Sequence, residues 1–155
     1  MIVSLSWLRT HLDLDGLTTA AIADLLTFAG VEVEGITERG VSSDHVVVGL
    51  VKSAEQHPNA DRLKVCLVDA GTGADHQIVC GATNYKVGDK VPLALPGAVL
   101  PGGFEIKAGK LRGVESGGMM CSGRELGLTD DHGGLLILDP AAPVGRPLRE
   151  VVPSD

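Results

Sequence analysis

The fold is decided by LALPGAVLPGGFEIKAGKLRGVESGGMMCSGRELGL, which runs from Leu93 to Leu128. Glycine and proline interrupt this stretch often, and residues 104–107 alternate apolar and charged side chains. Residues 110–112 continue the alternation, with only Ala108 and Gly109 between the two runs. The pattern predicts a β-hairpin with a two-residue turn at Ala108-Gly109.

The alternation also sets the register of this hairpin. Ile106 would pair with Leu111 on the buried face. Glu105 would then lie opposite Arg112 on the outer face, where opposite charges stabilise a sheet.

Short strands are predicted on both sides of this stretch. They cover residues 46–54, 63–69, 77–80, 91–95 and 135–138, with a turn at 57–61. The spacing Ser122-x-x-Glu125 is that of a capping box and predicts one short helix that ends at Gly127. A last helical turn is expected near residues 147–151, because Pro147 suits its start. Strands at this spacing indicate a closed or nearly closed β-barrel.

The first 38 residues follow a different pattern. Strands are predicted at 2–5 and 31–36, and helices over 6–12 and 19–29, capped by Ser6 and Thr18. Two strands and two short helices cannot bury enough surface to stand alone. We therefore expect this unit to belong to a domain that is completed elsewhere.

Composition limits both the core and the partners. Hydrophobic residues make up 44% of the 155 residues and aromatic ones only 3%, so the core must be aliphatic. The net charge of −7 is unusual for a strong stand-alone nucleic-acid binder. Residues 52–124 nevertheless hold 9 basic and 7 acidic side chains, so any electrostatic footprint is expected there.

The cysteines and the hydropathy pattern indicate a cytoplasmic protein. Cys66, Cys80 and Cys121 are far apart and form no C-x-x-C pair, which predicts reduced, buried thiols rather than a disulfide framework or a zinc site. No signal-peptide pattern or run of 18 apolar residues is present, so neither secretion nor a membrane span is predicted.

The middle of the chain resembles the tRNA-binding module of the OB-fold class. The matching pieces span residues 45–146 and are His57-Pro58-Asn59-Ala60-Asp61-Arg62-Leu63, the Val65 to Asp69 strand, Ile78 to Ala82 with Asn84, Pro96-Gly97, and the run from Gly113 to Ser122. The opening residues, 4–8 and 25–34, are similar to the start of the β chain of bacterial phenylalanine–tRNA ligase. The chain is therefore interpreted as an N-terminal fragment of that β chain.

The resemblance implies a mainly β fold with an α+β N-terminal part. An OB-fold β-barrel at 39–148 would be inserted into an incomplete mixed α/β domain, formed by residues 1–38 and resumed at 149–155. The family's ligase uses ATP and Mg²⁺, and its aminoacylation and editing sites lie outside this fragment. No catalytic residue, cofactor or metal is therefore expected here. The implied partners are tRNA, the α subunit and the rest of the β chain in a heterotetramer, and not a membrane.

Basic and amide side chains of the barrel are the candidate tRNA contacts. They are Arg62, Lys64, Asn84, Lys107, Lys110, Arg112 and Arg124. The predicted hairpin would place Lys107 beside Lys110, a repulsion that an anion would relieve. Because aromatic residues are scarce, we expect contact with the shape and backbone of folded RNA rather than stacking of single-stranded bases.

A second group of motif residues is expected to support the structure. It comprises His57, Pro58, Asn59, Ser116, Met119, Cys121, Ser122 and Glu125. His57 lacks a placed partner for general-base catalysis, and no base accompanies Ser116 or Cys121.

Three hypotheses for function remain open at this point. The barrel could bind tRNA weakly as one contact of a larger enzyme, or act as an assembly module with little RNA contact. A free-standing tRNA-binding dimer is the third, and the first 38 residues count against it.

Overall fold

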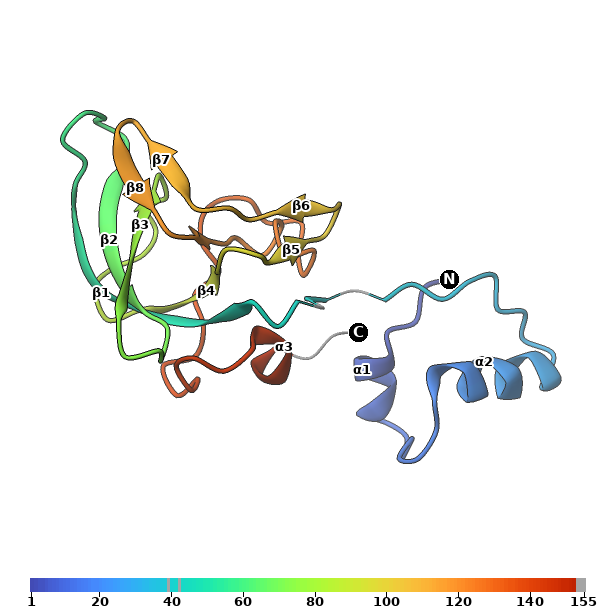
Figure 1. The fold of residues 1–155 in the computed structure, drawn as a ribbon. Coiled ribbons are helices and arrows are strands. Elements are labelled where there is room, and N and C mark those ends of the chain that lie inside the picture. Colours follow the sequence, from blue (N-terminus) through green and yellow to red (C-terminus); the bar gives the residue numbers. More distant parts are fainter. Residues whose placement is uncertain (39, 42, 153–155) are drawn as a thin grey trace. The chain divides into compact units, whose positions relative to one another are not determined.

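The computed structural model describes residues 1–38, 40–41 and 43–152 (Figure 1). The chain divides into two compact units, Met1–Arg39 and Gly40–Ser154. The predicted return of residues 149–155 to the first domain falls partly outside the described residues and stays a prediction.

Two short helices make up the regular structure of the first unit. Helix α1 spans Leu5–Arg9 and helix α2 spans Thr19–Phe28. As predicted, the Thr18 hydroxyl caps α2 by accepting from the Ala21 N–H at 3.1 Å. The cap of α1 is Ser4, which accepts from the Trp7 N–H at 3.1 Å, so the prediction of Ser6 was wrong.

The strands predicted at 2–5 and 31–36 are also wrong. Residue 5 already belongs to α1, and residues 31–36 have no regular structure. A strand exists only when a second strand satisfies its backbone groups, and no strand is described in this unit. Only Leu14 and Ile22 are buried among its large apolar side chains.

The second unit is built on a five-stranded antiparallel sheet in the order β3-β2-β1-β4-β9. Its strands are β1 (Val46–Gln56), β2 (Lys64–Asp69), β3 (Asp75–Cys80), β4 (Lys90–Ala94) and β9 (Met119–Met120). Two ribbons complete it: β5 (Val99–Leu100) with β6 (Phe104–Glu105), and β7 (Gly109–Leu111) with β8 (Val114–Ser116). The four long strands match the predicted positions to within two residues.

Hydrogen bonds from β3 nearly close this sheet into a barrel. The Gly117 N–H donates to the Gln77 carbonyl at 2.8 Å, and the Gln77 side chain donates to the Glu115 carbonyl at 2.8 Å. The Val79 N–H donates to the Ser116 hydroxyl at 3.1 Å. The predicted OB-like barrel is thereby confirmed.

Strand β1 is buried on both faces because the core has two parts. Val46 and Val48 point into one apolar cluster, and Val47 and Val51 point into the other. A register shift between Val51 and Ser53 bends β1, so that it pairs with β4 at one end and β2 at the other. Through this bend, β1 joins β2 on one side and β4 on the other into one curved sheet.

The predicted hairpin register is wrong. Strand β7 turns at Arg112-Gly113 and pairs with β8, which places Lys110 opposite Glu115, while β6 pairs with β5. The φ angles of Arg112 and Gly113 are 51° and 84°. A two-residue turn that requires positive φ at both positions suits a glycine there, and the predicted Ala108-Gly109 turn would have forced alanine into that conformation.

Two further local predictions fail in part. The capping-box bonds form: Glu125 Oε2 accepts from the Ser122 N–H at 2.7 Å, and the Ser122 hydroxyl accepts from the Glu125 N–H at 3.2 Å. They cap a run of turns rather than a helix, because the Leu128 N–H bonds back to the Gly123 carbonyl at 2.9 Å. Residues 135–138 form isolated backbone bonds but no strand.

The last described helix, α3, spans Leu148–Val151 and begins just after Pro147, close to where it was expected. Leu148 is fully buried in the cluster that holds Val46 and Val48. This helix therefore packs within the second unit.

Candidate nucleic-acid interface

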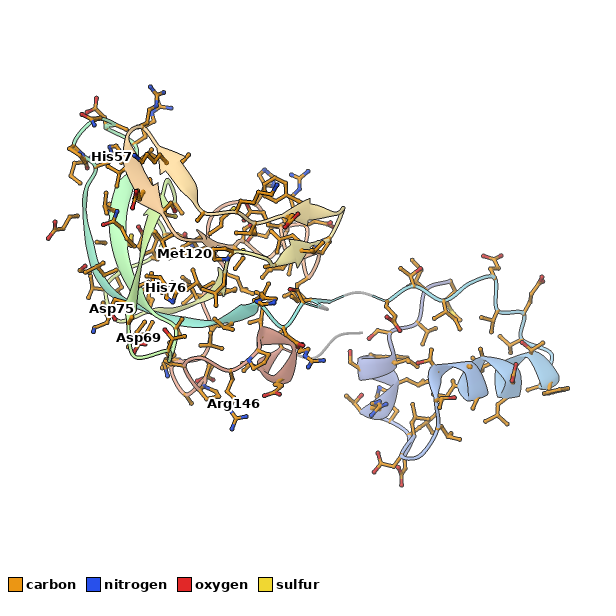
Figure 2. All side chains as sticks on the ribbon, in the orientation of Figure 1. His57, Asp69, Asp75, His76, Met120 and Arg146 are labelled. Carbon is orange, nitrogen blue, oxygen red and sulfur yellow. The ribbon has the colours of Figure 1, made fainter. Side chains whose placement is uncertain are left out.

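The loop between β1 and β2 is fastened to the β7–β8 hairpin by His57 (Figure 2). The ring is only 3% exposed, and its Nδ1 accepts from the Asn59 N–H at 2.9 Å. Its Nε2 therefore carries the proton and donates to the Leu111 carbonyl at 2.9 Å. The Asn59 amide adds a bond to the Arg112 carbonyl at 3.2 Å. Two segments that are more than 50 residues apart in the sequence thus form one end of the barrel.

The exposed side chain of Gln56 stabilises the same loop through hydrogen bonds to its backbone. Its amide nitrogen lies near three backbone carbonyls, those of Ala60 at 2.9 Å, Asp61 at 3.1 Å and Leu63 at 3.2 Å. Gln56 was not among the predicted site residues, although a polar amide at the end of a strand and before a turn is a usable signal.

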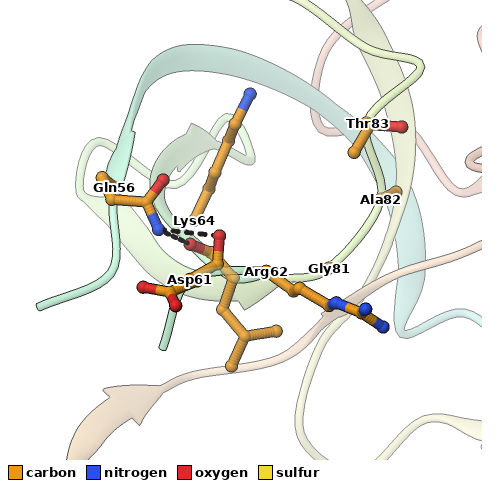
Figure 3. A pocket seen from close by; sticks show the side chains of 8 residues that line it. Gln56, Asp61, Arg62, Lys64, Gly81, Ala82 and Thr83 are labelled. Carbon is orange, nitrogen blue, oxygen red and sulfur yellow. Dashed lines mark hydrogen bonds between the residues drawn. The ribbon is translucent and has the colours of Figure 1, made fainter. Parts of the chain in front are cut away.

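A shallow pocket of about 370 Å³ lies beside this loop (Figure 3). It is lined by Gln56, Asp61, Arg62, Leu63, Lys64, Gly81, Ala82 and Thr83. Arg62 is exposed, while Lys64 is partly buried and lies 5.8 Å from the centre of the Tyr85 ring. The pocket therefore unites two of the predicted contact residues, from the β1–β2 loop and the start of β2.

The other predicted cations lie on the neighbouring elements. Lys107 and Lys110 share a groove between β6 and β8, and Arg112 occupies the β7–β8 turn next to Asn59. Arg124 lies in the capped turn at 122–127 and lines neither pocket. The fold thus brings Arg62 and Arg112 to the same end of the barrel.

Apart from Lys86, the other Lys and Arg side chains described in the second unit are held by neighbours. Lys52 pairs with Asp75, Arg146 with Glu150 and Arg149 with Asp44. Lys90 donates to the carbonyls of Pro140 and Ala142. Within the described part of the chain, no ion pair involves Arg62, Lys64, Lys107, Lys110, Arg112 or Arg124. These six charges are available to an anion.

Asn84 is exposed, but its side chain is already engaged by the backbone of Leu135. Its amide nitrogen donates to the Leu135 carbonyl at 2.9 Å, and its oxygen accepts from the Leu135 N–H at 2.9 Å. The side chain therefore clamps residues 135–138 to the barrel. Its role as a tRNA contact remains a prediction.

The buried thiols and Ser116 are satisfied by neighbours. The Ser116 hydroxyl donates to the Gly118 carbonyl at 3.0 Å. Burial raises the pKa of the Cys121 thiol to about 12, and burial also raises the pKa of Cys66 and of Cys80. A raised pKa disfavours the nucleophilic thiolate. The Cys66 thiol lies 3.0 Å from the Tyr85 hydroxyl, a buried contact that sequence analysis did not foresee.

The comparison with protein families matches these elements closely. Residues 46–147, from the start of β1 to the start of α3, match the family described as "Putative tRNA binding domain". The chain belongs to this family of tRNA-binding domains. The match covers the whole barrel, including the β1–β2 loop and the β7–β8 hairpin.

Longer relatives of this tRNA-binding domain are ligase subunits. The chain is 56% identical over 156 aligned residues to the phenylalanine–tRNA ligase β subunit of Cupriavidus pinatubonensis, and 51% identical over 150 to that of Dechloromonas aromatica. Both alignments cover 97% of this chain, which spans 19% of each relative's length. The predicted resemblance to that β chain is confirmed.

A solved structure with a related sequence is the MetRS-related protein from Pyrococcus horikoshii. It is 27% identical, with a TM-score of 0.49, and the alignment covers 65% of this chain and 85% of that one.

In the part of the tRNA-binding chain that the structure describes, no helix is long and apolar enough to cross a membrane.

Proposed function

We propose that this chain binds tRNA through the end of the barrel formed by the β1–β2 loop and the β7–β8 hairpin. It would do so as part of a phenylalanine–tRNA ligase β subunit, in the ATP-dependent attachment of phenylalanine to tRNA(Phe). The ligase chemistry, with its ATP and Mg²⁺, would take place outside these residues. The role of the chain is therefore to hold RNA and not to react with it.

One observation carries this proposal: two arginines that the fold brings to this end of the barrel form no ion pair among the described residues. Lys52, Arg146 and Arg149 are held by carboxylates, but Arg62 and Arg112 are not. The bonds from His57 and Asn59 fix the two loops that carry these arginines. Because the backbone of these loops is fixed before binding, less entropy is lost when their arginines bind phosphate.

The charge balance predicts weak binding. The chain carries a net charge of −7, and acidic side chains such as Asp61 and Glu115 lie among the candidate contacts. Affinity in the micromolar range or weaker, with strong dependence on salt, is the expected behaviour. This suits a domain that adds one contact to a larger enzyme.

The rest of the ligase is the proposed protein partner. Most large apolar side chains of the first unit are exposed, including Trp7, Leu25, Phe28 and Ile36. We propose that further β-chain residues cover this surface and complete an α/β domain that begins with residues 1–38. The α subunit, a heterotetrameric assembly and a cytoplasmic location belong to the same proposal.

A charge-matched pair of double variants tests the RNA interface. Arg62→Ala/Arg112→Ala removes two unpaired charges, and Arg146→Ala/Arg149→Ala removes two paired ones. Only the first is expected to weaken binding of a tRNA transcript, in a filter-binding series at several salt concentrations. The slope of log K against log salt should fall by about 1.4–1.8, since each lost phosphate contact contributes roughly 0.7–0.9. Equal effects of the two variants would contradict the proposed interface.

The second candidate is an assembly module with little RNA contact. The net charge of −7 and the exposed apolar surface of the first unit favour it. The same titration separates the two, because an assembly module should show no tRNA binding at about 50 mM salt. Sedimentation of the isolated chain addresses the free-standing dimer, which a monomer would exclude.

A further inference from the structure

The 104–119 groove is a second hollow, separate from the pocket beside the β1–β2 loop. Its volume is about 210 Å³. It is lined by Val79, Phe104, Glu105, Ile106, Lys107, Gly109, Lys110, Leu111, Ser116, Gly118 and Met119. Strands β6, β7 and β8 therefore supply most of its walls, and Figure 1 shows β6 and the β7–β8 ribbon following one another along the same side of the barrel.

An exposed aromatic ring lines this groove. The chain has only one Trp, one Tyr and two Phe, and Tyr85 is buried. Phe104 is 61% exposed and Leu111 is 48% exposed, whereas Ile106 is buried in the core. The barrel thus keeps its sole aromatic ring outside the core at the groove, and an exposed ring of this kind offers a flat surface to a partner.

Two lysines flank the ring. Lys107 and Lys110 are both exposed and line the same groove. Among the described residues neither forms an ion pair. The groove therefore combines an apolar face with two cations.

We infer that the 104–119 groove binds an unpaired nucleotide of the RNA, with its base stacked on Phe104 and its phosphates held by Lys107 and Lys110. The inference rests on the proposed function and names the part of the RNA that this surface takes. It revises the expectation, based on the scarcity of aromatic residues, that base stacking plays no part. One ring is enough for one base.

Charge complementarity favours a nucleotide over an apolar protein segment. Two lysines against the single carboxylate of Glu105 give the lining a net positive charge. An apolar peptide would cover Phe104 but would leave both ammonium groups without partners. A nucleotide supplies a flat base for the ring and anionic oxygens for the lysines.

The test separates stacking from charge in the 155-residue chain. Phe104→Ala and Phe104→Leu remove the ring, and the latter keeps an apolar side chain of similar reach. Val99→Ala is the matched control, because Val99 is also an exposed residue of the β5–β6 ribbon but does not line the groove. Binding is measured with a single-stranded oligoribonucleotide, with the same oligomer made abasic, and with a tRNA transcript. Circular dichroism confirms that each variant is folded.

Both Phe104 variants are expected to weaken binding of the single-stranded RNA by about 5- to 150-fold. They should leave the salt slope and the affinity for the abasic oligomer unchanged. Lys107→Ala/Lys110→Ala should instead lower the salt slope for both oligomers. Phe104→Trp should retain binding, and the RNA should quench the fluorescence of the new indole. The unsubstituted chain, which contains Trp7, gives the background signal.

Three results would overturn the inference. In the first, Phe104→Leu binds RNA as tightly as the unsubstituted chain, while Arg62→Ala/Arg112→Ala still weakens tRNA binding. The proposed function would then stand, and the inference about the groove would fail. In the second, the Phe104 effect is the same on the abasic oligomer. In the third, no RNA binds at about 50 mM salt, and the proposed function fails as well.

Discussion

The two units of the chain differ in how far they bury similar apolar side chains. In the second unit, valines and leucines such as Val46, Val51 and Leu93 are fully buried. In the first, Phe28 is 90% exposed and Leu25 is 58% exposed, although both lie on a properly capped helix. A good helix signal therefore does not by itself produce a core.

The difference lies in where the partners come from. Strands of the second unit pair with strands distant in the sequence, as β4 does with both β1 and β9. Such pairing closes a curved sheet around its own side chains. The helices of the first unit are local structures, and a helix gains most of its stability in proteins from packing against something else.

The largest expected effect comes from a matched pair of leucines. Leu93→Ala opens a cavity in the barrel core and should lower the free energy of unfolding by about 2–5 kcal/mol. Leu25→Ala removes an exposed side chain from a helix and should change it by less than about 0.5 kcal/mol. Urea denaturation of the two variants measures the difference. A comparable loss for Leu25 would show that the first unit carries a core of its own.

Two glycines with the same backbone conformation test how tightly the barrel is packed. Gly145 and Gly73 have φ angles of 85° and 84°. A Cβ at Gly145 would lie 2.8 Å from the Ala70 carbonyl oxygen, whereas one at Gly73 meets nothing within 4 Å. Both alanine variants incur about 1–2 kcal/mol for the left-handed conformation. Gly145→Ala should lose about 1–3 kcal/mol more through the clash, and equal losses in thermal or urea unfolding would argue against close packing there.

Alkaline pH should weaken the second unit specifically, since all three cysteines lie there. Burial raises the pKa of Cys121 from 9.0 to about 12, so the folded state favours the neutral thiol. Its contribution is complete below pH 9 and is lost as the pH rises from 9 toward 12. At pH 10 the cost is about 1.4 kcal/mol.

Cys121→Ala provides the control for this pH dependence. Its unfolding free energy should fall less steeply above pH 9 than that of the unsubstituted chain, by about 1.4 kcal/mol at pH 10. The remaining slope includes Cys66, Cys80 and Tyr85, whose pKa values burial also raises, and Lys52, whose pKa is raised by its hydrogen bond to Asp75. Parallel curves for the two proteins would remove Cys121 as a cause.

Much of the barrel could be predicted because its long strands carry local signals. The run of valines at 46–48, the turn residues at 57–61 and the apolar run at 65–68 each indicate their own structure. The Thr18 cap and the Ser122–Glu125 box form the bonds that their spacing implies. These features depend on neighbours within a few residues.

The errors fall where a strand has more than one possible partner. Residues 104–107 alternate correctly for a hairpin with 110–112, but β6 pairs with β5 and β7 with β8. Positive φ at Arg112 and Gly113 decided between the two turns. Residues 135–138 look like a strand but are held by Asn84 and by isolated backbone bonds.

The sequence by itself determined the barrel, its long strands, its turns and its relation to tRNA-binding domains, because each depends on short patterns. Only the tertiary structure decided which loops share an end of the barrel. The bond from His57 to the Leu111 carbonyl joins residues 54 positions apart, and no local pattern specifies such a contact. The same holds for which cations are left without carboxylate partners, since pairing depends on distances in space and not on order along the chain.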